Sequence, residues 1–154
     1  MKIFAQFLLL FVAFAPVAAF AQREKIPADD LEIVEKRWPA AKKTQTGIRY
    51  IVEREGAGDM PKPGDKVAVL YVGRLLNDTI FDQNQDPAQP FTFRVRREMV
   101  IEGWDQILQQ MKKGEKRLVI IPPELAYGTR GQPPKIGRNA TLVFEIELLS
   151  FGKD

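Results

Sequence analysis

The feature that most constrains the fold is a strict two-residue alternation near the C-terminus, in "ATLVFEIELL" (residues 140–149). Apolar side chains occupy one side of the extended chain: Leu142, Phe144, Ile146 and Leu148. The other side is polar: Thr141, Glu145 and Glu147. One buried and one solvated face is typical of a strand in an antiparallel sheet. Such a strand needs partners, so the rest of the chain has to supply a sheet.

Four further runs of β-branched and aromatic residues, bounded by Gly, Pro, Asn or Asp, predict these partners. They are residues 48–54, 66–75, 91–95 and 116–121. A single helix is predicted from Trp104, because apolar residues follow it at i+3, i+4 and i+7, with Lys112, Lys113 and Gly114 as its cationic last turn and stop. We therefore expect an α+β fold, a five- to six-stranded antiparallel half-barrel sheet wrapped around one short helix.

The first 21 residues predict a secretory signal peptide. Lys2 precedes an apolar run, and Ala19-Phe20-Ala21 provides an A-x-A cleavage site. A membrane-spanning helix is the alternative, but Pro16 interrupts an apolar run already shorter than the roughly 20 residues a span needs. No cysteine lies nearby for a lipoprotein anchor, so no stable membrane anchor is expected after cleavage. We expect an exported protein, more consistent with a bacterial periplasm than with the extracellular space or the ER lumen.

Residues 22–45 form a charged lead-in to the predicted domain at residues 46–152. They are consistent with one short amphipathic helix and a polar linker, or with a solvated segment that packs loosely on the domain. The helix signals are a possible N-cap, apolar residues at helical spacing and a proline stop: Asp29 or Asp30, Leu31, Val34, Trp38 and Pro39. A separate dimerisation domain would not fit in this length, so a monomer is expected.

The residue inventory excludes several chemistries. The chain has no His and no Cys, and Ser150 is its single serine. Histidine-based triads, thiol nucleophiles and ordinary zinc sites are therefore missing, and no metal or cofactor is expected. The formal net charge of +3 is small and its signs are interspersed, which does not favour nucleic acid as a partner. Catalysis by this chain would have to proceed without an activated nucleophile.

Aromatic residues near predicted loops suggest an apolar pocket for an uncharged ligand, which would bind by burial and be oriented by a few hydrogen bonds. The alternative is that these residues only form the core, and we assign Phe93 to the core. The residues are Tyr71, Phe81, Phe91, Phe93, Trp104, Tyr127 and Phe144, with Val100 and Ile101 beside them.

Five motifs in order resemble the FKBP-type peptidyl-prolyl isomerases, the macrolide-binding immunophilins. The resemblance covers residues 46–151. The motifs are "YVGRLLNDTIFD" (71–82), "PFTF" (90–93), "VIEGW" (100–104), "LAYG" (125–128) and "NATLVFEIELL" (139–149).

The resemblance implies a proline-binding pocket between the half-barrel and its helix. Trp104 would be its floor, and the Ile101 N–H and Tyr127 hydroxyl would contact substrate carbonyls. Asp82, in a loop, would be a buried acceptor partnered by Tyr71. The implied catalytic residues are Asp82, Tyr127, Ile101 and Phe81, and the implied substrate-binding residues are Tyr71, Phe91, Val100, Trp104, Ile136 and Phe144.

The function implied is peptidyl-prolyl cis-trans isomerisation during folding of exported proteins, with macrolides of the FK/rapamycin type as possible inhibitors. The alternatives are a module or chaperone that holds proline-containing segments with little turnover, and a purely structural domain. The chain departs from the family pattern at Pro87, Met99, Gln132 and Lys135. These positions would rim the pocket, so they bear on sequence preference and macrolide affinity. Two N-x-T sequons, at Asn77 and Asn139, are also present.

Overall fold

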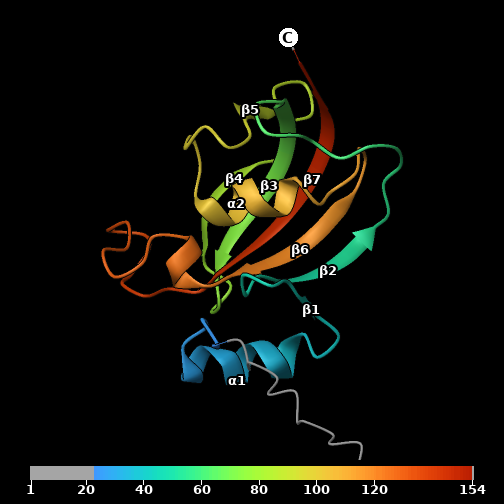
Figure 1. The fold of residues 1–154 in the computed structure, drawn as a ribbon. Helices are drawn as coiled ribbons and strands as arrows, with labels where there is room; N and C mark the ends of the chain where they lie inside the picture. Colours follow the sequence, from blue (N-terminus) through green and yellow to red (C-terminus); the bar gives the residue numbers. More distant parts are fainter. Residues whose placement is uncertain (1–22, 154) are drawn as a thin grey trace, which may run out of the picture.

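The computed structural model describes residues 23–153, and the predicted signal peptide lies outside the described residues. It contains two α-helices, a short 3-10 helix and seven strands (Figure 1). The helices are α1 (Ala28–Arg37), α2 (Glu102–Leu108) and η1 (Pro123–Leu125). The strands are β1 (Lys42–Lys43), β2 (Arg49–Arg54), β3 (Lys66–Leu75), β4 (Ile80–Asn84), β5 (Phe91–Arg94), β6 (Lys116–Ile121) and β7 (Leu142–Gly152).

The strands form one antiparallel sheet in the order β1-β2-β6-β7-β3-β4, with β5 also paired to β3. Strand β7, the one with the clearest alternation, lies at the centre and pairs with both β3 and β6. The sheet curves around α2 (Figure 1), which confirms the α+β prediction. Strands β1 and β4 were not predicted, because β1 has only two residues, both lysines, and three of the five residues of β4 are polar.

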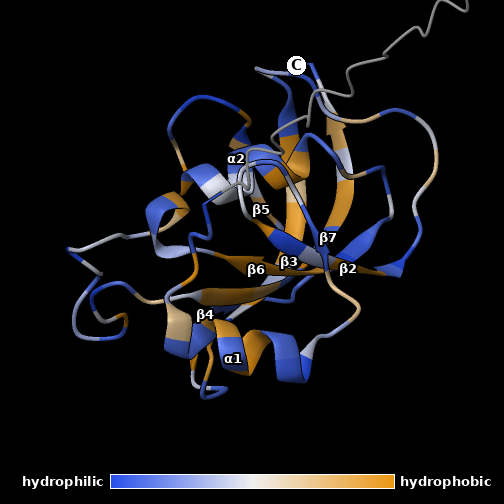
Figure 2. Cartoon of the chain, turned by 60° about the horizontal axis from the view of Figure 1, so that its bottom comes forward, coloured by the Kyte–Doolittle hydropathy of each residue, from blue (hydrophilic) through white to orange (hydrophobic). Residues whose placement is uncertain are grey.

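The main core fills the space between α2 and the concave face of the sheet. Ile107 and Leu108 of α2 are fully buried there, together with Ile146 and Leu148 of β7. Strands β3 and β6 carry much of the hydrophobic colouring in Figure 2. Phe93 is only 2% exposed and belongs to this cluster, in agreement with its assignment to the core.

Helix α2 is shorter than predicted, and the expected last turn at Lys112, Lys113 and Gly114 is wrong. The helix ends at Leu108, although Met111 beyond it is still fully buried. Backbone groups of this segment bond to distant partners instead. The Gly114 N–H donates to the Leu148 carbonyl at 2.7 Å, and the Lys113 carbonyl accepts from the Ala57 N–H at 3.0 Å. These long-range bonds draw the chain away from the helix axis.

Helix α1 covers part of the opposite face of the sheet. Its Val34 is fully buried against Ile120 and Val143, beside Ile26 from the lead-in. The lead-in is therefore a packed helix rather than a loosely attached segment. It begins after Pro27, not at Asp29 or Asp30, and ends at Arg37. The predicted solvated face of β7 is thus partly covered.

Among residues 23–153, no helix is long and apolar enough to cross a membrane.

Candidate active site

An apolar cavity of about 170 Å³ lies between the sheet and the start of α2. Residues from β3, β4, β5, β7, α2 and two loops converge on it. Nine of the ten residues implied by the resemblance line it: Tyr71, Phe81, Asp82, Phe91, Val100, Ile101, Trp104, Tyr127 and Phe144. Met99 also lines it. Asp82 is the one charged residue among these, so the cavity suits an uncharged group.

Trp104, on the first turn of α2, is both a core residue and part of the cavity wall. It is 4% exposed and packs against four aromatic rings. Its ring meets those of Tyr71 at 4.9 Å and Phe144 at 5.3 Å between centroids, both edge to face. Such contacts add stability beyond burial alone and hold the ring in one orientation. Trp104 is therefore a rigid surface at which an apolar ring can pack.

The side wall depends on a glycine in β3. Gly73 pairs with both Asp82 and Phe144. A Cβ atom at Gly73 would lie 2.7 Å from Phe81 and 2.8 Å from Phe144. The two rings, 5.5 Å apart and perpendicular, occupy the space that any larger residue would need. Glycine at this position thus allows two aromatic rings to meet above the sheet.

A hydrogen-bonded pair lies at the edge of the cavity. The Tyr71 hydroxyl donates to Asp82 Oδ2 at 2.8 Å, and the Gln83 N–H donates to Asp82 Oδ1 at 2.9 Å. Burial and the neighbouring Asp82 raise the pKa of Tyr71, which keeps the hydroxyl a donor at neutral pH. The pairing of Tyr71 with Asp82 is as expected. However, Asp82 lies in β4 rather than in a loop, and it is exposed rather than buried.

Donors without partners line the cavity, and the buried indole N–H of Trp104 is one of them. Within residues 23–153 neither the Ile101 N–H nor the Tyr127 hydroxyl has a hydrogen-bond partner. Ile101 is the N-cap of α2, and Tyr127 follows η1. Burial and the charge of Asp82 raise the pKa of Tyr127, so its hydroxyl keeps its proton. An unpaired donor in apolar surroundings is costly unless a ligand satisfies it.

The structure changes the expected lining at one position. Ile136 does not line the cavity; it is 1% exposed and belongs to the main core. Met99 is 59% exposed and lies at the cavity edge, in agreement with the rim position that the resemblance implied.

Asp105 supports the cavity from behind and was missed in the sequence. Its carboxylate is buried and accepts the backbone N–H of Arg96 at 2.8 Å. Arg96 has a φ of 60°, an unfavourable conformation for a side chain of this size. The bond therefore holds the segment that leads to Met99 and Ile101. Burial raises the pKa of Asp105. The signal available in the sequence was an acidic residue directly after Trp104, next to the apolar stripe of the predicted helix.

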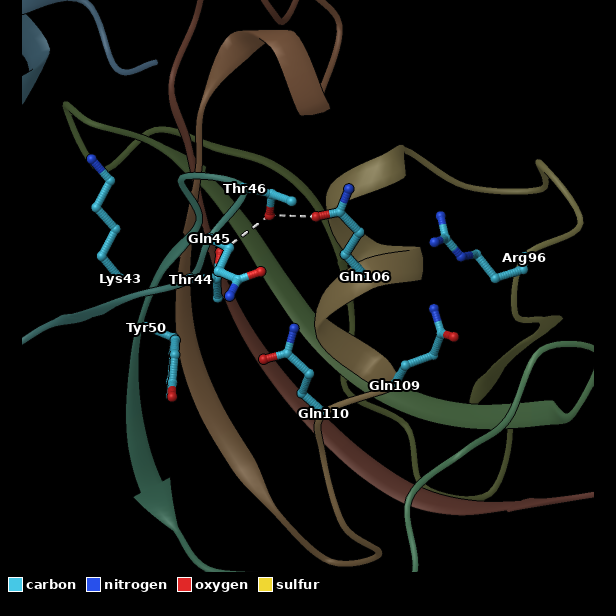
Figure 3. Close-up of a pocket in the computed structure, with 9 residues that line it drawn as sticks. All are labelled: Lys43, Thr44, Gln45, Thr46, Tyr50, Arg96, Gln106, Gln109 and Gln110. Carbon is cyan, nitrogen blue, oxygen red and sulfur yellow. Dashed lines mark hydrogen bonds between the residues drawn. The ribbon is translucent and has the colours of Figure 1, made fainter. Parts of the chain in front are cut away.

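A larger, polar cavity of about 580 Å³ lies near the other side of α2 (Figure 3). It shares no lining residue with the first. Several of its polar side chains already have hydrogen-bond partners within the protein. The Thr46 hydroxyl donates to Gln106 Oε1 at 2.6 Å, and Gln106 Nε2 donates to Glu102 at 3.0 Å. Gln109 Nε2 donates to the Asp105 carbonyl at 2.6 Å.

Within the described residues, no group of three or more acidic side chains is arranged to hold a metal ion.

Comparison with known proteins identifies the class. The family model of the FKBP-type peptidyl-prolyl cis-trans isomerases matches residues 58–149. The chain therefore belongs to this family, whose members isomerise the bond before proline.

Particular relatives share a large part of the chain. The peptidyl-prolyl cis-trans isomerase Mip of Coxiella burnetii is 41% identical over 118 residues, 77% of this chain and 50% of Mip. FK506-binding protein 1 of Dictyostelium discoideum is 42% identical over 105 residues, 68% of this chain and 98% of the relative. The human isomerase FKBP4 is 41% identical over 136 residues, which cover 87% of this chain and 28% of FKBP4. The chain thus spans half or less of several curated relatives.

Solved structures of similar proteins have the same fold. The crystal structure of FkpA from Escherichia coli has a TM-score of 0.73 and 41% identity, covering 82% of this chain and 59% of FkpA. A peptidyl-prolyl cis-trans isomerase from Pseudomonas syringae has a TM-score of 0.73 and 37% identity, covering 84% and 94% of the two chains.

Proposed function

We propose that this chain accelerates cis-trans isomerisation of Xaa-Pro bonds in the aromatic cavity. The observation that supports this most is the cavity itself, an apolar space lined by Trp104, in which the Ile101 N–H and the Tyr127 hydroxyl have no partner among residues 23–153. It suits a prolyl ring flanked by carbonyl groups. The whole chain lacks the His and Cys that bond-breaking chemistry would commonly use.

The reaction needs no nucleophile. Rotation about an Xaa-Pro bond is opposed by amide resonance, with a barrier of about 18–20 kcal/mol. The twisted transition state has lost conjugation and is less dipolar than the planar amide, so an apolar cavity disfavours the ground state more. Each 1.4 kcal/mol or so of this difference gives about a tenfold gain in rate.

Within this proposal each residue has a role. The prolyl ring packs on Trp104, between the rings of Phe81, Phe91 and Phe144. The Ile101 N–H and Tyr127 hydroxyl bind carbonyl oxygens on either side of the twisting bond. Tyr71 holds Asp82 at the cavity edge, next to the amide.

Substrates and location follow as further parts of the proposal. Proline-containing, unfolded exported proteins would be the clients of a monomeric enzyme, and FK/rapamycin-type macrolides would compete with them for the cavity. The signal-like residues 1–21 support export, with a bacterial periplasm favoured. Intact-mass measurement of the protein from its native cell would reveal cleavage after Ala21 and any glycan at Asn77 or Asn139. An uncleaved chain would contradict the export proposal.

The decisive experiment measures isomerisation of short Xaa-Pro peptides by the purified protein, with and without a macrolide inhibitor. We expect acceleration that the macrolide abolishes. Asp82→Ala should lower turnover, whereas Lys113→Gln, a change at an exposed position outside the lining residues, should not. A protein that suppresses aggregation of an unfolded client without accelerating isomerisation would be a binding module. Unchanged turnover and peptide affinity in both Asp82→Ala and Tyr127→Phe would leave a purely structural domain.

A further inference from the structure

A cationic loop borders the cavity, and the proposed function does not account for its charge. This tip loop, residues 128–139, contains Arg130, Lys135 and Arg138 and no acidic residue. All three cations are exposed. It begins directly after Tyr127, which lines the cavity, although no residue of the loop itself is among the lining residues.

The tip loop has a defined shape. Gln132 and Ile136 exchange two backbone hydrogen bonds, at 2.9 and 3.0 Å, and the Asn139 N–H closes its base on the Gly128 carbonyl at 2.8 Å. Ile136 anchors the loop in the core with 1% exposure. Gly131, with φ of 64°, lies so close to Gly137 that a Cβ would be 2.6 Å from its carbonyl oxygen. The cations are therefore carried on an anchored backbone.

One of the cations reaches the cavity wall. Lys135 Nζ donates to the backbone carbonyl of Phe81 at 3.0 Å. Phe81 lines the cavity and precedes Asp82, its one charged lining residue. The positive charge of Lys135 thus partly offsets the negative charge of Asp82 at the cavity edge.

The other two cations are uncompensated. Neither Arg130 nor Arg138 has an ion-pair or hydrogen-bond partner within residues 23–153. The tip loop therefore carries three positive charges, one of which, on Lys135, reaches the cavity wall next to Asp82. A field of this sign raises the encounter rate and affinity of anionic ligands.

We propose that the tip loop makes this enzyme prefer substrates with Asp or Glu next to the proline. The proposal rests on the proposed isomerase function and names its substrate class. Lys135 places a positive charge at Phe81, which packs against the prolyl ring in the proposed complex. Arg130 and Arg138 add positive charge further along the tip loop. Lys135 is then a specificity-determining residue rather than a catalytic one.

The test compares matched peptides Ala-Xaa-Pro-Phe with Xaa as Glu, Gln or Lys, and a second set with the same residues after proline. Glu and Gln have nearly the same size and shape, so their ratio isolates charge. In about 0.01 M salt we expect kcat/KM for a Glu peptide to exceed that of the Gln peptide by about 3- to 10-fold in at least one set. In about 1 M salt, where the screening length falls to about 3 Å, the ratio should approach one.

Variants locate the effect. Replacing Arg130, Lys135 and Arg138 together with Gln should bring the Glu-to-Gln ratio close to one. The single changes Arg130→Gln and Arg138→Gln remove no hydrogen bond, so they guard against misfolding, and each should lower the ratio in part. Lys113→Gln makes the same change of charge at the opposite end of β6 and should leave the ratio unchanged.

The outcomes separate the two proposals. Turnover of the Gln peptides with a Glu-to-Gln ratio near one in both sets would overturn the tip-loop inference and leave the isomerase function standing. A preference that persists in the triple variant would also overturn it. Absence of turnover with every peptide would instead contradict the proposed function.

Discussion

The two cavities near α2 differ both in volume and in how far their polar groups are already hydrogen-bonded within the protein. The larger, about 580 Å³, is lined by polar groups such as Thr46 and Gln106 that bond to one another. The smaller, about 170 Å³, is apolar and contains donors with no partner among the described residues, including those of Ile101, Trp104 and Tyr127. Hydrogen bonds already made within a protein stabilise its fold, whereas unmade ones are available to a ligand. The comparison teaches that unmet hydrogen-bonding capacity, rather than volume, indicates the site.

Two substitutions on α2, one at each cavity, should differ most strongly in their effect on kcat/KM. Trp104→Leu should lower kcat/KM for Xaa-Pro peptides at least 30-fold, because the prolyl ring loses its packing surface. It should also cost about 2–4 kcal/mol of unfolding free energy, because the indole packs against four aromatic rings. Gln106→Leu, facing the polar cavity, should change kcat/KM less than twofold. Unaltered turnover in Trp104→Leu, with reduced stability, would make Trp104 a core residue only.

Gly73→Ala should damage the apolar cavity through its wall. The new methyl group would meet Phe81 and Phe144 at under 3 Å, so both rings must move. We expect a loss of about 1–3 kcal/mol in stability and about a tenfold fall in kcat/KM. Gly152→Ala is the matched control, since a Cβ there meets nothing within 4 Å. Equal behaviour of the two variants would show that the ring positions are not needed.

Tyr127→Phe tests the unmet donor directly. Loss of one hydrogen bond to substrate should lower kcat/KM about fivefold. Because the hydroxyl has no partner within residues 23–153, thermal unfolding should be unchanged. A lower midpoint of unfolding with normal turnover would mean that the hydroxyl serves the fold instead.

Glu24, which bonds Lys43 at the edge of the polar cavity, should affect stability and have the smallest effect on turnover. Lys43 donates to Glu24 at 2.7 Å, and Arg49 also bonds this carboxylate. Burial alone would raise the pKa of Glu24, but these bonds and the N–H groups of Ile26 and Lys25 lower it to about 2. Glu24 therefore stabilises the fold in its ionised form. Glu24→Gln should cost up to about 1 kcal/mol at pH 7.

The stability that ionised Glu24 contributes should depend on pH. A lowered pKa contributes stability above the unfolded value of about 4.5 that is lost as the pH falls toward 2. Unfolding measured between pH 7 and pH 2 should show the Glu24→Gln variant and the parent protein converging at the acid end. A difference that is constant with pH would contradict the ionised role, and altered peptide turnover at pH 7 would link the lead-in to the active site.

Much of the fold could be read from local pattern. Runs of β-branched and aromatic residues predicted the two strands that flank β7, residues 66–75 and 116–121, with the bounds that the structure has. Strand β4 and the end of α2 could not be read in this way. Three of the five residues of β4 are polar, and the end of α2 depends on hydrogen bonds to Ala57 and Leu148, which are distant in sequence.

The sequence by itself determined the class of fold, the absence of His and Cys chemistry and most of the residues around the cavity, because these follow from residue type and from short motifs. Tertiary structure decided which side chains face the cavity. Ile136 turns into the core, and Asp82 is exposed rather than buried. Only the folded chain brings Lys135 onto the Phe81 carbonyl, 54 residues away. Side-chain direction in loops depends on contacts between distant segments, which no local pattern specifies.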